Sequence, residues 1–277
     1  MKQIVVPVDF SSCAENALKF ALEIARETGA ELTMVHAQFL EVNASYANLG
    51  ANPDAREIRG IIIERFDRLR KELLEKNVDF EGRLNYEVRL GPITQEILDT
   101  ADELKADLVV MGTHGSTGFL DKILFGSNTS EVIEQSKVPI MVIPEKANYE
   151  GFKQIVFAAD YHDLQHENSL KILLEMARIW DSEVNFVSVK DGSDYGGDRA
   201  TEEVNFDQLL ADIPHHFKVI KDKQVIHVLE NYARKKHAQL LVTMPQKHSF
   251  LAGLFHTSVS KELALRARMP LLCLPDK

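Results

Sequence analysis

A glycine-containing segment and one aspartate are the residues of this chain best suited to binding a ligand. Gly112 and Gly115 follow a predicted strand, and Gly126-Ser127-Asn128-Thr129 opens a predicted helix. Glycine lets the backbone come close to a ligand, and the free amides and dipole of a helix N-terminus attract anions. We expect these two elements to bracket a chain of phosphates. Asp9, which follows the first predicted strand, is expected to accept hydrogen bonds from ribose hydroxyls.

Each of these residues also has a structural interpretation. Asp9 is suited to the role of an acid at a helix N-terminus, and Ser127 to that of an N-cap. Single glycines at strand ends and helix starts are common in any α/β protein, but the set taken together with Asp9 favours a ligand site. The sequence contains no GxxxxGK[ST] and no GxGxxG after the first strand, which argues against a P-loop enzyme and a dinucleotide dehydrogenase.

The strands and helices predicted for the first half of the chain alternate. Strands are predicted at 4–8, 32–37, 83–90, 107–111 and 138–144, and helices at 14–28, 55–76, 93–104 and 127–136. This alternation is typical of a doubly wound parallel sheet in an α/β/α sandwich. Ligands bind such a sheet beyond the carboxyl ends of the strands where the strand order reverses, so Asp9, Ala37, Gln38 and Gly112 are expected to meet there. The apolar stripe of the helix at 55–76 is expected to face core or an interface, and its mixed charges give no reason to expect a lipid partner.

The second half of the chain repeats the first. Residues 15–37 align without a gap to 167–189, and ten of the 23 aligned residues are identical. The same element order follows, with strands at 154–159, 183–189, 217–220, 240–244 and 270–275 and helices at 170–180 and 225–237. Two tandem domains are therefore predicted, at 1–147 and 151–277, which suits a chain of 277 residues.

Each repeat ends in a short apolar strand bracketed by prolines, at 139–144 and 270–275. An exposed apolar edge promotes aggregation unless it is paired. We therefore predict that these two strands pair across the interface, which makes the chain an intramolecular pseudo-dimer. A homodimer of whole chains is left open.

The composition of the chain argues against two classes of partner, nucleic acids and membranes. A formal net charge of −10 argues against nucleic acid, and the absence of an apolar run of about 20 residues argues against a membrane span. The N-terminus does not resemble a secretory signal, so we expect a cytoplasmic protein. Cys13 and Cys273 occupy unrelated places in the two repeats and are expected to be free thiols.

The run from Met111 to Thr129 resembles the glycine signature of the universal stress protein family, Gly-x2-Gly-x9-Gly-Ser/Thr, and Val5-Val6-Pro7-Val8-Asp9 resembles that family's first strand and ribose-binding aspartate. Val88-Arg89-Leu90-Gly91-Pro92 is similar to its third strand ending. The resemblance implies two Rossmann-like domains, similar to the adenine nucleotide alpha hydrolases. It implies ATP as the ligand, with Mg²⁺ carried on the phosphates.

Carried over residue by residue, the resemblance implies Pro7, Val8, Asp9 and Ala37 around the adenosine, and Met111 and Gly112 beside the ribose. It implies Gly115, Gly126, Ser127, Asn128 and Thr129 around the phosphates. Ten residues separate Gly115 from Gly126, one more than in the usual signature.

The second repeat has lost the signature. Met244-Pro245-Gln246-Lys247 stands where the first repeat has Gly112 to Gly115, and Pro245 removes an amide donor. Asp160 remains at the place of Asp9. Nucleotide binding is therefore expected in the first domain only. His162 and His166 have the i, i+4 spacing of metal ligands, but surface histidines are the preferred interpretation because no metalloenzyme motif accompanies them.

The sequence thus predicts a nucleotide-dependent switch or sensor in the stress response. No general base aimed at a γ-phosphate is evident, since His114 has no visible orienting partner, and at most slow hydrolysis is expected. The alternative is an interaction scaffold that binds no nucleotide, for which the longer glycine loop is the best argument. A nucleotidyl-transferring enzyme is a more distant alternative, because no catalytic signature for it is present.

Overall fold

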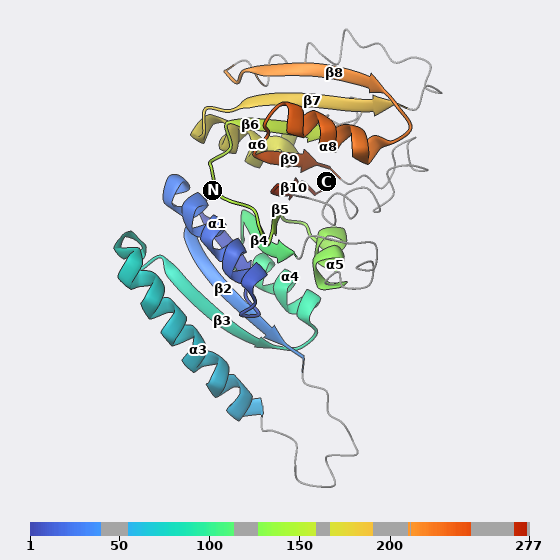
Figure 1. Ribbon diagram of the computed structural model, residues 1–277. Coiled ribbons are helices and arrows are strands. Elements are labelled where there is room, and N and C mark those ends of the chain that lie inside the picture. The colour runs from blue at the N-terminus through green and yellow to red at the C-terminus, as the bar shows by residue number, and fades with distance from the viewer. Residues whose placement is uncertain are drawn as a thin grey trace, which may run out of the picture.

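The computed structural model describes residues 1–39, 55–113, 127–158, 167–190, 210, 212–244 and 269–275, and the side chains at 127, 167–169 and 190 lie outside that description. Strands and helices alternate through both halves (Figure 1). In the first half the elements are β1 (Gln3–Pro7), α1 (Ser12–Thr28), β2 (Glu31–Gln38), α3 (Ala55–Lys76), η1 (Val78–Phe80), β3 (Leu84–Leu90), α4 (Ile93–Glu103), β4 (Leu108–Thr113), α5 (Ser127–Gln135) and β5 (Ile140–Pro144). In the second half they are β6 (Gln154–Ala158), α6 (Glu167–Ile179), β7 (Glu183–Lys190), β8 (His215–Lys221), α8 (Val225–Lys235), β9 (Leu240–Thr243) and β10 (Leu271–Cys273).

All ten of these strands belong to one sheet, in the order β3-β2-β1-β4-β5-β10-β9-β6-β7-β8. Within each half the strands are parallel, and the order of the second half mirrors that of the first. The doubly wound α/β arrangement predicted from the alternation of elements is confirmed, as is its repetition in tandem.

The two halves join through their last strands. β5 and β10 pair antiparallel, with Met141 opposite Leu272, and all the residues of β10 are buried. The predicted pairing of the two proline-bracketed strands is confirmed. An edge that would be exposed in one isolated half is therefore covered by the other half of the same chain.

The core lies on both faces of the sheet, because alternate residues of a strand point to opposite faces. Ile4 and Val6 of β1 pack with apolar residues of α1, α3 and α6, and this cluster continues into the second half. Val5 of the same strand packs on the other face with α4, α5 and α8. The result is a three-layer α/β/α sandwich whose core is continuous between the halves (Figure 1).

Helix α1 has the start and stop signals expected from its sequence. The Ser11 hydroxyl accepts a hydrogen bond from the Ala14 amide at 3.2 Å, which caps one of the free donors at the N-terminus. Gly29 follows the last turn with φ 72°, a left-handed conformation that glycine adopts without a steric penalty. The helix predicted to end at Gly29 is therefore confirmed.

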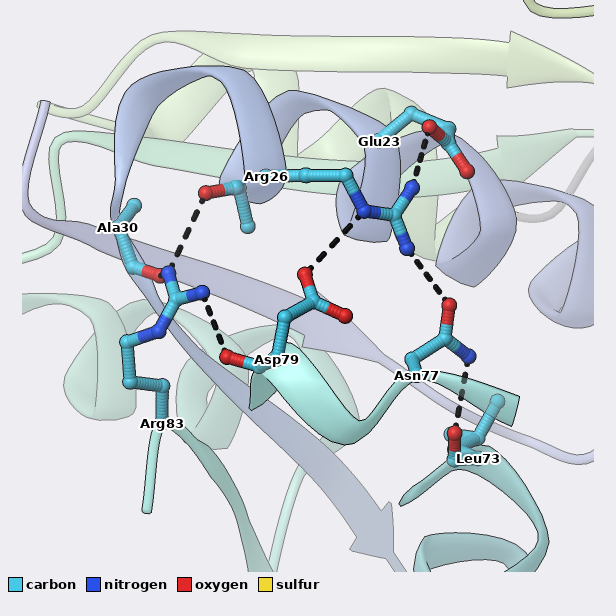
Figure 2. A network of polar contacts seen from close by, with 8 residues as sticks. Glu23, Arg26, Ala30, Leu73, Asn77, Asp79 and Arg83 are labelled. Atoms are coloured by element: carbon cyan, nitrogen blue, oxygen red, sulfur yellow. Dashed lines mark hydrogen bonds and ion pairs between the residues drawn. The ribbon is translucent and has the colours of Figure 1, made fainter. Parts of the chain in front are cut away.

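A polar network fixes the end of α3 and the turn after it onto α1 (Figure 2). Arg26 of α1 donates to Glu23, to Asp79 and to the side-chain oxygen of Asn77, and Arg83 donates to the carbonyl oxygens of Ala30 and Asp79. Both guanidinium groups also lie over the ring of Phe80, at 5.6 and 4.7 Å from its centroid. The C-terminal end of α3 is therefore held by many contacts.

Candidate functional site

The first half has its topological switch point between β1 and β4. β1 pairs with β2 on one side and with β4 on the other. Strands β2 and β3 are therefore added on one side of β1, and strands β4 and β5 on the opposite side. In open α/β sheets ligands bind at such a point, beyond the carboxyl ends of the strands. The residues that follow β1, β2 and β4 therefore define the candidate site, as the sequence predicted.

Pro7 is the last residue of β1 at this edge, and Val8 follows it. Val8 continues the contact with β2, because its amide donates to the Val35 carbonyl at 2.8 Å. Its carbonyl oxygen lies 2.7 Å from Nδ1 of His36. Since a carbonyl oxygen only accepts, Nδ1 of His36 is the donor. The buried Val8 is therefore hydrogen-bonded through both its amide and its carbonyl, and these bonds set the direction in which the chain continues to Asp9.

Asp9 is exposed at the edge of the sheet, and one oxygen of its carboxylate is used locally. Oδ1 accepts a hydrogen bond from the Ser11 amide at 2.9 Å, which forms an Asx turn immediately before α1. Among the residues that the structure describes, no hydrogen bond reaches Oδ2. Both interpretations of Asp9 therefore remain compatible: it orders the turn before the helix with one oxygen and offers a second to a hydroxyl group.

Ala37 lies near the end of β2, next to β1 in the sheet, and is half-buried. Its small side chain offers apolar surface at the end of the strand next to β1, whereas the side chain of Val8 is buried in the core. Gln38, the last residue of β2, uses its carbonyl oxygen to accept from the Gly91 amide at 3.0 Å. The β3 ending that resembled a family motif is therefore tied to the same edge.

Gly112 and Met111 lie at the end of β4. A Cβ added to Gly112 would stand 2.5 Å from the carbonyl carbon of Cys13 and closer still to its oxygen. The first turn of α1 thus packs directly on β4 at this point, and only glycine leaves room for it. The structural interpretation of this glycine thus has a specific cause, the close packing of α1 on β4, which the sequence did not indicate.

The first turn of α5 holds Asn128 and Thr129, both half-buried. Val132 and Ile133 of α5 pack in the same cluster as Met111, so the helix is seated on the face of the sheet beside β4. Thr94 of α4 fixes it further, because the threonine hydroxyl donates to Glu131 at 2.8 Å. This contact between helices was not predicted, and no spacing in the sequence indicates it.

Several predicted residues fall outside the described part of the chain. They are Gly115, Gly126, the side chain of Ser127, His114, Pro245, Asp160 and the pair His162 and His166. Of the predicted set, the structure brings Pro7, Val8, Asp9, Ala37, Met111 and Gly112 to one edge of the sheet.

Two carboxylates act on a buried thiol at the same edge. Burial and the negative charges of Glu145 and Asp9 raise the pKa of Cys13 to about 11. Glu145 follows β5, and its carboxylate accepts from the Ser12 hydroxyl at 2.7 Å. Glu145 was absent from the predicted site, although its position just after a terminal strand at the carboxyl edge was a usable signal.

Other kinds of site find no support in the described ranges. No group of three or more His, Cys, Asp or Glu side chains gathers there in a way that suits a metal ion. None of the helices placed by the structure has the length and apolar character required to span a bilayer.

Comparison with known proteins gives one consistent result. The model described as "Universal stress protein family" matches residues 1–144 and again 151–275. "Universal stress protein MJ0531" of Methanocaldococcus jannaschii is 32% identical over 142 residues, covering 51% of this chain and 81% of that protein. "Universal stress protein MJ0577" of the same organism is 28% identical over 156 residues, covering 52% and 96%. The crystal structure of a universal stress protein from Archaeoglobus fulgidus covers 99% of this chain and 98% of its own, with a TM-score of 0.73 and 17% identity.

Proposed function

Because the chain belongs to the universal stress protein family, with one family unit in each half, we propose that its first domain, residues 1–147, binds ATP and acts as a nucleotide-dependent switch or sensor in the stress response. The nucleotide lies beyond the carboxyl ends of β1, β2 and β4. The second domain, residues 151–277, keeps the fold without a nucleotide site. Mg²⁺ enters with the phosphates and needs no ligand set of its own in the protein.

The observation that carries this proposal is the geometry of Asp9 at the switch point. The Ser11 amide fixes the carboxylate through Oδ1, so the side chain is oriented before any ligand arrives. An exposed, oriented carboxylate beside a small apolar residue fits a ribose hydroxyl pair next to an adenine ring. Ala37, half-buried near the end of the neighbouring strand, supplies that apolar surface.

Charge at the site favours a magnesium complex of ATP over the free polyanion. Asp9 and Glu145 both lie close enough to Cys13 to raise its pKa, so the edge is locally negative. Like charges repel, and a divalent cation on the phosphates offsets part of that repulsion. The amides at the N-terminus of α5, together with Asn128 and Thr129 in its first turn, are the groups suited to the phosphates.

A scaffold that binds no nucleotide is the second candidate, and one observation favours it. Gly112 is needed for the packing of α1 on β4, so this glycine of the signature has a purpose without any ligand. Under this alternative the family fold is retained for protein contacts alone.

Calorimetric titration with MgATP separates the two. The switch proposal expects about one nucleotide per chain. It expects Asp9→Asn to weaken binding by roughly ten-fold, as loss of a charged hydrogen-bond acceptor does, and Gly126→Asp to abolish it. Asp107→Asn is the matched control, because Asp107 is also an exposed aspartate that accepts backbone hydrogen bonds, at the opposite ends of the strands. Absence of any heat with the unmodified protein would favour the scaffold.

A further inference from the structure

The residue after Asp9 has an unusual backbone conformation. Phe10 has φ 62°, in the left-handed region that a bulky side chain seldom occupies. Such conformations persist where surrounding contacts enforce them, and they concentrate at functional sites. Phe10 therefore needs partners that hold it, and those partners connect the candidate site to a distant element.

The ring of Phe10 lies in a row of aromatic contacts. Its centroid is 5.4 Å from that of His36 and 5.1 Å from that of Phe66, and Phe66 stacks on Tyr86 at 4.9 Å. Phe66 belongs to α3 and is fully buried. The row thus runs from the carboxyl edge of the sheet, where His36 donates to Val8, to the outermost helix of the first half.

The side chain of Arg65 also contacts the ring of Phe10. The guanidinium carbon of Arg65 lies 3.8 Å from the centroid of the Phe10 ring, within the range of a favourable cation–π interaction. Arg65 precedes Phe66 on α3 and is exposed. Two consecutive residues of α3 therefore contact the ring of Phe10, the residue directly after the ribose-binding candidate Asp9.

Besides this contact, the N-terminal half of α3 packs on the core through Ile58 and Ile62. Of its 22 residues only Ile62 and Phe66 are buried. Its far end is fastened by the Arg26 and Arg83 network, which lies around Asn77 and Phe80 (Figure 2). The Phe10 contact thus attaches the middle of α3, where its N-terminal half ends, while the C-terminal end of the helix is held independently.

From these contacts we propose that Phe10 is a positioning residue that couples nucleotide occupancy at the candidate site to the position of the N-terminal half of α3, with Arg65 as its partner. This inference rests on the proposed function. A ligand hydrogen-bonded to Asp9 holds the turn in which Phe10 is left-handed, and so holds the ring against Arg65 and Phe66. The outer surface of α3 is then the surface whose order changes with nucleotide, which gives the switch a physical form.

Hydrogen exchange with and without MgATP tests the coupling in the full chain. We expect MgATP to slow exchange of the amides at 59–66 by about five-fold, the lower end of typical coupling between sites. The amides at 70–76 should not respond, because the polar network holds them already. Phe10→Leu and Arg65→Ala should each remove this response. Because coupling in binding is reciprocal, each should also lower the affinity for MgATP by up to the same factor.

Matched variants separate coupling from simple loss of packing. Phe80→Leu also removes a buried ring that lies under arginine, but away from the site, and should leave the response at 59–66 intact. Phe10→Tyr keeps the ring and should restore the response. Arg65→Ala changes an exposed side chain and is expected to fold, so it decides the matter if Phe10→Leu does not.

The two proposals fail in distinguishable ways. If the unmodified protein shows no binding of MgATP by calorimetry, the proposed function falls and the coupling with it. If MgATP binds but leaves exchange at 59–66 unchanged, the coupling is wrong and the proposed function stands. The same holds if MgATP slows exchange at 59–66 in Phe10→Leu and Arg65→Ala as much as in the unmodified protein.

Discussion

Replacement of Gly112 by alanine tests the packing of α1 on β4. The new methyl group would stand 2.5 Å from the Cys13 carbonyl carbon, a backbone atom in the first turn of α1 that cannot rotate aside. Overpacking of this kind costs about 1–3 kcal/mol, and we expect the upper end because the helix itself must shift. The φ of Gly112 lies outside the left-handed region, so the cost arises from the clash alone.

Gly60→Ala provides the matched control. Gly60 lies inside α3, and a Cβ there meets nothing within 4 Å. Alanine in an exposed helix is favoured over glycine by about 0.5–1 kcal/mol, so this variant should be slightly more stable. The same chemical change is thus predicted to act with opposite sign at the two positions.

Thermal unfolding without nucleotide measures both changes. The entropy of unfolding of a chain of this length is about 0.6 kcal/mol/K, so a loss of about 3 kcal/mol lowers Tm by about 5 °C, while Gly60→Ala raises it by about 1 °C. A Gly112→Ala protein as stable as the unmodified one would refute the packing argument. If that variant were fully stable yet unable to bind ATP, the glycine would instead serve the ligand.

Three further predictions concern the described core and the junction of the halves. Asn16→Ala should lower the free energy of unfolding by about 1–3 kcal/mol in urea titrations, because its side-chain amide donates at 2.9 and 3.0 Å to the carbonyls of Pro144, which ends β5, and of Ala147 after it; unchanged stability would contradict this. Cys13 and Cys273, whose pKa values burial raises to about 11 and about 12, should react with a thiol reagent at pH 8 only after unfolding, and fast reaction of the folded protein would show that one of them is accessible. Burial raises the pKa of Tyr149 to about 12 against 10 in the unfolded chain, so its contribution to stability is complete below pH 10 and is lost as pH rises toward 12; Tyr149→Phe should show a smaller decline over that range, and an equal decline would assign it to other groups.

The sequence was most informative where hydrophobic pattern and chain-breaking residues agree. The long helix predicted at 55–76 has those bounds in the structure, and α1 ends at Gly29 as predicted. The pairing of β5 with β10 followed from an edge-strand argument, because each of these apolar strands would leave one edge unpaired within its own repeat.

Polar edges and very short elements were harder to predict. β8 begins at His215 and ends at Lys221, beyond the predicted 217–220, because the added residues at the ends of this outermost strand are polar and show no hydrophobic pattern. The η1 turn at Val78–Phe80 was missed, since three residues carry no periodicity.

Features of the site that depend on distant contacts could not be read from the sequence. The packing of Gly112 on Cys13 joins residues about a hundred positions apart, and the left-handed Phe10 depends on Arg65 and Phe66 of α3. The Asx turn at Asp9 could have been predicted from the sequence, because an aspartate two residues before a serine N-cap is a known local pattern.

A crystal structure of the full chain grown in excess MgATP would show directly whether the first domain binds nucleotide. We expect one nucleotide, beyond the carboxyl ends of β1 and β4, with its ribose hydrogen-bonded to Asp9 and its phosphates near the start of α5. An empty edge in the first half, or nucleotide bound only in the second half, would contradict it.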